Sequence, residues 1–430
     1  MSIVIGEGAA GCVHKPSLEC KNKKIDYKNK VSKLMDIDNA NDELDEYKLI
    51  SKLDKNKDFY LGKPLSCLPA KTKKNLKAIN LCEDFDSQDI NDYKLLLLKD
   101  GGSNLKELGK KYSELSINSN NTKKVELFFI EAHRLLFALK VFLDNNILHH
   151  DLKPQNIVYN EDTNRINIID FGFMMDKKKI LKDLKLSKYK HATFHWNWPF
   201  ELVFLNKNNY VKIANKNSEE KAKFFNELKD SKYLNVKDKM KLFYQTTCND
   251  KNFIKLNSAN FLSTIINLNN DEYENFIIKC INTLDIYGVG ISLMYVIQKS
   301  EHLLKKNLFI DLEELFKEMI SAAVFTRPNI DILLNKYENI LEYHSMLKKY
   351  KLYFKNHKIR QVNSSILNVF DKFTDTISKS KLSTNKIKEI ESNDKDSNIF
   401  NKSVNKSKKR RNKKYKKNAK LNVTKKSPYK

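Results

Sequence analysis

Two polar motifs enclose a pair of short apolar segments between residues 149 and 172, and this arrangement constrains the fold more than any other feature of the chain. The first motif is HHDLKPQN, His149–Asn156, and the second, Asp170–Gly172 (DFG), begins 14 residues after Asn156. The segments between them, NIVYN and RINIID, are typical of the two strands of a hairpin. Because a hairpin returns the chain to its starting edge, we expect both motifs to face the same place.

The side chains of these motifs are those that phosphoryl transfer requires. Asp170 and Asn156 offer the hard oxygen ligands that Mg²⁺ prefers. Asp151 can accept the proton of an attacking hydroxyl, and Lys153 can neutralise charge on the transferred phosphate. The pattern therefore predicts catalytic roles for Asp151 and Lys153 and a metal site at Asn156 and Asp170. The alternative is that these polar residues form an ordinary solvent-exposed turn without a catalytic role.

A glycine-rich motif near the start of the chain indicates the same chemistry. The chain has only 10 glycines, and three of them form the pattern GEGAAG at residues 6–11. Glycine lets a backbone approach phosphates closely. The flanking segments are typical of strands. This favours a strand–turn–strand loop that covers a triphosphate, and it disfavours a dinucleotide site, in which the motif lies between a strand and a helix. A plain hairpin turn is the alternative. The residues predicted to contact ATP here are Ile5, Gly6, Glu7, Gly8, Ala9, Ala10, Gly11, Cys12 and Val13.

The order of the predicted elements indicates an α+β fold. Residues 2–35 read as three strands, 41–53 as a helix and 123–145 as a long helix, and the chain is mainly helical beyond Val203. This order predicts a small sheet lobe and a larger helical lobe. The longest uncharged apolar run, 286–297, is too short to span a bilayer, so we expect a buried core helix, no leader segment and no membrane association.

The six cysteines form no CxxC pair and are spread widely along the chain. This spacing favours reduced thiols in a cytosol-like compartment over disulfides or a zinc site. They are Cys12, Cys20, Cys67, Cys82, Cys248 and Cys280.

Basic charge is concentrated at the C-terminal end. The formal net charge is +26, and residues 402–430 carry 14 Lys or Arg and no acidic residue. We expect 346–390 to be partly helical and 391–430 to be disordered, because apolar residues are sparse there. The run KKRRNKK is similar to a nuclear localisation or polyanion-binding patch. The alternative is a solvated extension shaped by composition, since Lys outnumbers Arg 73 to 6 in the whole chain.

Together, the glycine loop, HHDLKPQN and DFG resemble the motifs of eukaryotic-type serine/threonine protein kinases over about residues 2–345. The resemblance implies the two-lobed protein-kinase fold, with an N-lobe of about 1–98 and a C-lobe of about 103–345. It implies ATP and Mg²⁺ as cofactors and protein Ser/Thr hydroxyls as substrates. Lys153, two positions after Asp151, is typical of the serine/threonine type.

The resemblance also assigns roles to residues outside the motifs. Lys33 in KVSKLM is similar to the ATP-binding lysine, with Lys30 as the alternative. Glu46 is its expected helix partner, with Glu43, one turn earlier, as the alternative. Three further residues are expected to support the fold around the site. They are Glu201, which ends the activation segment; Arg327, its buried partner; and Asp285, which opens or caps a buried helix.

The chain departs from the family pattern in the catalytic loop and in its length. His150 stands where many kinases have Arg, so activation by phosphorylation of the 173–200 segment is not expected. Thr193 is the expected contact for Asp151 and Lys153. Glu201 and Asp285 lie 84 positions apart, which predicts an insertion at about 206–275 with helices such as SEEKAKFFNELKDS.

The stretch GCVHKPSLEC, followed by KVSKLM, is most similar to divergent kinases of large nucleocytoplasmic DNA viruses. That likeness implies a host cytoplasmic or virion location, with a nuclear one through the basic run 408–417 as the alternative. A catalytically inactive pseudokinase scaffold is the alternative function. The presence of Lys33, Asp151, Asn156 and Asp170 favours an active enzyme.

Overall fold

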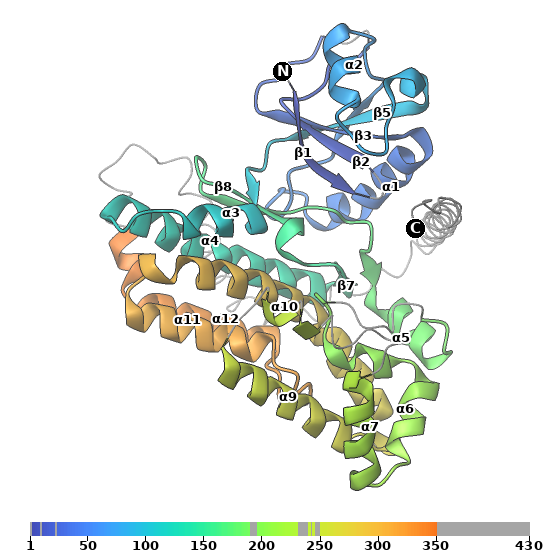
Figure 1. Ribbon diagram of the computed structural model, residues 1–430, viewed down its shortest axis with the longest axis vertical. Coiled ribbons are helices and arrows are strands. Elements are labelled where there is room, and N and C mark those ends of the chain that lie inside the picture. Colours follow the sequence, from blue (N-terminus) through green and yellow to red (C-terminus); the bar gives the residue numbers. More distant parts are fainter. Residues whose placement is uncertain are drawn as a thin grey trace, which may run out of the picture. The chain divides into compact units, whose positions relative to one another are not determined.

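The chain folds into two compact units. The computed structural model describes residues 2–8, 11–21, 24–189, 196–230, 240–241, 243–245 and 250–350. One unit lies within Met1–Asp100 and the other within Gly101–Lys372 (Figure 1). Several predictions concern residues outside the described ranges, namely Ala9, Ala10, Thr193, most of segment 346–390 and the tail 391–430.

The first unit is built on a five-stranded sheet in the order β1-β2-β3-β5-β4, with every neighbouring pair antiparallel. The three predicted N-terminal strands are present as its first three members. The strands are β1 Ile3–Gly8, β2 Gly11–Lys15, β3 Lys30–Asp36, β4 Leu65–Cys67 and β5 Tyr93–Lys99.

Side-chain alternation along β5 explains how this sheet is covered. Leu95 and Leu97 belong to an apolar cluster that includes Ala78 and Ile79 at the end of α2, Lys73–Ile79. Leu96 faces the other way and clusters with Ala40 of α1, Ile37–Leu53. The two helices therefore contribute to separate apolar clusters, and α1 begins four residues before the predicted helix. A short 3-10 helix, η1 Ser87–Asp92, leads into β5.

Two disulfides contradict the expectation of reduced thiols for four of the six cysteines, and Cys248 lies outside the described residues. Cys12 of β2 is bonded to Cys82, and Cys20 to Cys67 of β4. The bonded pairs are 70 and 47 residues apart, so only the folded sheet brings them together. The His14 imidazole lies 3.5 Å from Cys82 Sγ. Cys12, His14 and Cys82 are arranged like metal ligands, but the disulfide uses both sulfurs. Cys280 is a buried free thiol.

The second unit contains two small antiparallel sheets near the two polar motifs. The predicted hairpin is confirmed as β8, Ile157–Asn160, paired with β9, Arg165–Ile168. β6, Ser103–Asn104, adds a third strand to β8. The other sheet joins β7, Ile147–Leu148, to β10, Met175–Asp176. β7 ends just before the first polar motif and β8 begins just after it. β9 ends just before the second motif and β10 begins soon after it.

Helices make up the rest of this unit, and α10 forms its core. α10, Tyr273–Ser300, packs against α3, α4 and α11, as Figure 1 shows. The other helices are α3 Leu105–Ser113, α4 Ser119–Asp144, η2 Pro154–Asn156, α5 Lys177–Lys185, η3 Phe200–Leu205, α6 Lys207–Ala214, α7 Ser218–Asp230, α9 Lys251–Ile266, η4 Asn270–Glu272, η5 Glu301–Leu303, α11 Lys306–Met319 and α12 Ile330–Tyr343.

The segment Asn270–Leu303, which includes α10, has the length and apolar composition of a membrane span. Of its most apolar window, 89% is buried inside the fold, as in a core helix. No other helix in the described part of the chain has that combination.

The predicted insertion is largely helical among its described residues. The segment SEEKAKFFNELKD forms α7, as predicted, and α7 packs against α9. The buried Lys221 amine donates hydrogen bonds to the carbonyl oxygens of Ile266 and Leu268, at 3.1 and 2.6 Å. These bonds satisfy carbonyls at the end of α9 and tie α7 to it.

Candidate active site

Asp151 is held by three neighbours in the second unit. The Lys153 amine lies 2.8 Å from Asp151 Oδ2, and Asn156 Nδ2 donates to the same oxygen at 3.1 Å and to the Asp151 carbonyl at 2.8 Å. Asn197 Nδ2 donates to Asp151 Oδ1 at 3.1 Å. The carboxylate is 7% exposed and is charge-paired, which suits a group that orients a hydroxyl and accepts its proton.

The backbone of the HHDLKPQN loop is attached to the middle of α10. Asp285 accepts hydrogen bonds from the backbone N–H groups of His149 and His150, at 2.7 and 2.8 Å. Burial raises the pKa of Asp285, and these hydrogen bonds oppose the rise. Asp285 lies well inside α10, so the prediction that it opens or caps the helix is wrong. Gly288, one turn on, allows the close approach, because a Cβ there would lie 2.4 Å from the Leu152 carbonyl oxygen.

The hairpin brings the two proposed metal ligands to the same edge. The Ile169 N–H donates to the Asn156 carbonyl at 2.9 Å, which places Asp170 beside the Asn156 segment. Because Asn156 Nδ2 is used by Asp151, its Oδ1 is the atom that can face a cation. Asp170 is exposed and has a φ of 62°, in the left-handed region. One carboxylate and one amide oxygen at one edge fit the donor set of Mg²⁺.

The glycine motif lies at the end of the β1–β2 hairpin in the first unit. Gly8 pairs with Gly11 at the end of the ladder. Ile5, Gly6 and Glu7 are exposed, and a Cβ at Gly6 would meet nothing within 4 Å. Gly11 differs, since a Cβ there would lie 2.7 Å from the Leu34 carbonyl oxygen. Packing therefore requires glycine at position 11. At position 6 the fold leaves room for a side chain, and the prediction that glycine lets a phosphate approach there stays a prediction.

Side chains on either side of this loop are fixed by the fold. Glu7 Oε1 accepts hydrogen bonds from the backbone N–H groups of Glu83 and Asp84. Cys12 is buried in its disulfide, so its side chain faces the core, and only its backbone could make the ATP contact that the sequence predicts. Val13 is half-buried and pairs with Lys33 across the sheet.

Lys33 forms its ion pair with Glu43. Its Nζ lies 2.5 Å from Glu43 Oε2, and both side chains are mostly buried. The family pattern favours Glu46 here, so the structure gives the pairing to the alternative residue. Both glutamates are buried on α1, three residues apart, and therefore lie on the same helix face. Lys30, the alternative lysine, bonds instead to the backbone carbonyl of Asp26.

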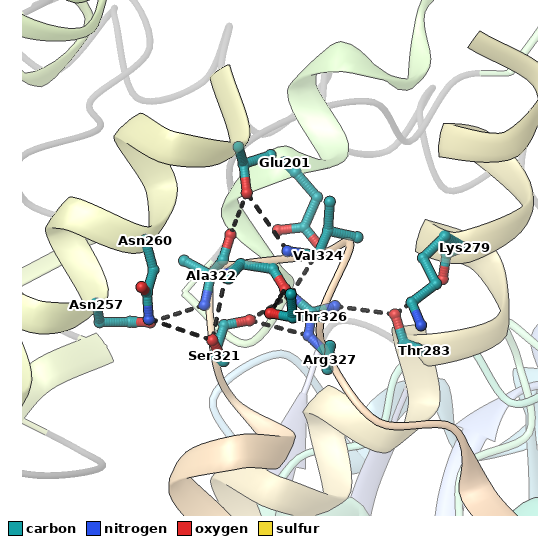
Figure 2. A network of polar contacts seen from close by, with 12 residues as sticks. Glu201, Asn257, Asn260, Lys279, Thr283, Ser321, Ala322, Val324, Thr326 and Arg327 are labelled. Carbon is teal, nitrogen blue, oxygen red and sulfur yellow. Dashed lines mark hydrogen bonds and ion pairs between the residues drawn. The ribbon is translucent and has the colours of Figure 1, made fainter. Parts of the chain in front are cut away.

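Glu201 and Arg327 form a fully buried ion pair, as the resemblance implies. Arg327 Nη2 lies 2.8 Å from Glu201 Oε1, and both side chains are 0% exposed. Figure 2 shows Arg327 also reaching Thr283 on α10, at 3.0 Å from Nη1, and the Ser321 carbonyl, at 2.9 and 2.7 Å. Burial raises the pKa of Glu201, and the Arg327 charge opposes the rise. Through Arg327, Glu201 of η3 is thus linked to Thr283 of α10.

Asn197 is a site residue that the sequence motifs do not indicate. It contacts Asp151 Oδ1, the role that the family pattern assigns to Thr193, which lies outside the described residues. The available signal is an Asn between two Trp residues, four positions before Glu201. That context alone does not distinguish a functional amide from a structural one.

No family model matches the chain. It is 28% identical over 117 residues to "Serine/threonine-protein kinase prpf4B" of Dictyostelium discoideum, a match that covers 27% of this chain and 13% of that protein. It is 48% identical over 40 residues to each of two proteins of Encephalitozoon cuniculi (strain GB-M1), "Probable cell division control protein 7 homolog 1" and "homolog 2". These matches cover 9% of this chain and 11% of each relative. The chain thus spans only a small part of the length of these relatives. Within the matched segments, its sequence is similar to serine/threonine kinases.

Proposed function

We propose that this chain is a serine/threonine protein kinase that transfers the γ-phosphate of ATP to protein hydroxyls with the help of Mg²⁺. The observation that carries the proposal is the arrangement around Asp151. A loop fixed to α10 by Asp285 presents a buried carboxylate that is held by Lys153, Asn156 and Asn197. The partial similarity to serine/threonine kinases supports the same reaction class.

Each residue has a defined part in the proposed reaction. Asp151 orients the substrate hydroxyl and takes its proton as the oxygen attacks phosphorus. Lys153 lies beside that carboxylate and offsets negative charge on the transferred group. Asn156 and Asp170 would hold Mg²⁺, whose charge neutralises the phosphates. In the first unit, Glu43 keeps the Lys33 amine in place for the α- and β-phosphates.

A phosphorylation assay tests this proposal. Purified chain is incubated with labelled ATP, Mg²⁺ and generic protein substrates, followed by phosphoamino-acid analysis. We expect phosphoserine and phosphothreonine, and a loss of about 10²–10⁴-fold in Asp151→Asn. Asp162→Asn is the matched control, because Asp162 is an exposed carboxylate between β8 and β9. Nucleotide binding without transfer in the unsubstituted chain would instead indicate a pseudokinase scaffold.

The finer placement among kinases of large nucleocytoplasmic DNA viruses rests on the stretch GCVHKPSLEC and KVSKLM alone. We propose it together with a cytoplasmic or virion location and with non-specific polyanion contacts through the basic tail. Microscopy of the tagged chain in infected cells tests the location. Accumulation in the nucleus that is lost on removal of 408–417 would favour the alternative.

A further inference from the structure

His150, the residue before Asp151, is enclosed by aromatic rings from the segment between Gly172 and Glu201. Its side chain is 1% exposed. The Phe173 ring stacks on the imidazole at 6.4 Å, the Tyr189 ring meets it edge-on at 5.9 Å, and the Trp198 ring lies at 5.4 Å. These contacts come from both ends of the segment, so one buried imidazole connects its start and its end to the catalytic loop.

A buried hydrogen bond accompanies this packing. The Tyr189 hydroxyl bonds to His150 Nε2. Burial raises the pKa of Tyr189, because the phenolate would lose its hydration, so the hydroxyl keeps its proton and remains able to form this hydrogen bond. The His150 backbone has a φ of 69° and is held by Asp285. The ring therefore has little freedom to turn away from Tyr189.

We propose that His150 and Tyr189 form a permanent lock that holds Phe173, Tyr189 and Trp198 against the catalytic loop without a phosphate. The inference rests on the proposed kinase function and assigns positioning roles to both residues. A phosphorylated segment needs a cation, usually Arg, to bind its phosphate. Here the equivalent contact is a hydrogen bond between a hydroxyl and an imidazole inside an aromatic cluster. A phosphate on Tyr189 would replace that hydroxyl and would not fit the buried site.

The lock acts on catalysis through its neighbours. Asn197, next to Trp198, donates to Asp151 Oδ1 and to the Leu152 carbonyl, at 3.1 and 3.5 Å. Movement of the segment would therefore move the amide that orients the catalytic carboxylate. The residues predicted to contact the nucleotide through the glycine motif lie in the first unit, outside this cluster, so we expect nucleotide binding to be unaffected.

Tyr189→Phe tests the lock with the smallest change, since it removes one hydroxyl. We expect hydrogen exchange in residues 173–189 to become faster and the peptide kcat/KM to fall about tenfold, with the KM for ATP unchanged. The matched control is Tyr337→Phe, which removes a buried hydroxyl that donates to the Phe129 carbonyl, far along the chain from the loop. It should lower the melting temperature and leave both exchange and kcat/KM unchanged.

His150 variants provide a rescue test. Gln can donate or accept a hydrogen bond with the Tyr189 hydroxyl and Leu can do neither, and neither residue is β-branched, so the positive φ affects both similarly. We expect His150→Gln to retain more activity and slower exchange than His150→Leu. Equal exchange in the two variants, or in Tyr189→Phe and the unsubstituted chain, would overturn the lock.

Phosphatase treatment separates the lock from the proposed function. Treated enzyme should keep its activity, and a loss of tenfold or more traced to residues 173–200 would refute a phosphate-independent lock. If the unsubstituted chain transfers no phosphate, the kinase proposal fails, whereas the exchange comparison still decides whether Tyr189 holds the segment.

Discussion

The ion pair of Lys33 gives a test at the level of single residues. We expect Glu43→Gln to lower turnover about tenfold or more, approaching Lys33→Met, because the amine loses the carboxylate that places it. Glu46→Gln, one turn later on α1, is the matched control and should lower turnover much less. Steady-state kinetics at saturating ATP gives the comparison. The reverse ranking would restore the pairing that the family pattern favours.

The buried pair Glu201–Arg327 predicts a large loss of stability. Arg327→Met leaves an uncompensated carboxylate at a fully buried position, which costs about 3–5 kcal/mol. Lys336→Met is the control, because Lys336 pairs with Glu318 at the surface and its loss costs about 0–1 kcal/mol. Urea unfolding monitored by fluorescence measures both. Similar midpoints for the two variants would contradict the prediction.

Residue types and short spacings predicted the side chains around Asp151, because Lys153 and Asn156 are its neighbours along the chain. They favoured Glu46 over Glu43 as the partner of Lys33, whereas the ion pair forms with Glu43. Both glutamates are buried on α1, so the sequence pattern alone does not decide between them. Asn197 was missed for a related reason. Its contact is set by the path of a long segment that local patterns do not describe.

At the scale of secondary structure elements, the two disulfides predict a redox-sensitive first unit. Cys12–Cys82 and Cys20–Cys67 close loops of 70 and 47 residues, and loss of each is expected to cost about 2–5 kcal/mol. Reduction should therefore lower the unfolding temperature of the sheet. Cys280→Ser is the control, because that thiol is buried and unbonded. The effect of this substitution on the unfolding temperature should be the same with and without reductant.

Thiol counting in denaturant checks the premise of this prediction. Four more thiols should react after reduction than before it. Equal counts would show that these cysteines are free in solution, as their spacing along the chain suggests.

Local patterns predicted the β8–β9 hairpin and α7, where turn residues or helical periodicity are strong. They placed the start of α10 too late. The apolar run at 286–297 is conspicuous, but the helix already begins at Tyr273, in a segment that mixes polar and apolar residues. The cysteine pairing failed for a different reason, because partners so far apart in sequence meet only through sheet assembly.

For the whole molecule, the charge distribution predicts that polyanion binding by the tail can be removed without loss of the proposed kinase activity. Residues 402–430 carry 14 basic side chains and no acid, and no motif residue of the proposed site lies there. Removal of residues beyond 390 should leave peptide turnover unchanged and weaken heparin or nucleic-acid binding, with a shallower dependence on salt. Binding titrations at several salt concentrations provide the measurement. Equal binding would place the polyanion site elsewhere, and loss of turnover would show that the tail contacts the fold.

The attachment of the HHDLKPQN loop to α10 has a consequence for protein synthesis. Asp285 follows His149 by 136 residues, yet its carboxylate holds the amide groups of the loop. Ribosomes add roughly 5–20 residues per second, so the loop is made about 7 to 27 seconds before its anchor. During that interval the nascent chain lacks the contacts that hold the loop backbone before Asp151. A growing polypeptide therefore cannot form the arrangement around Asp151 until α10 has been translated and has folded against the loop.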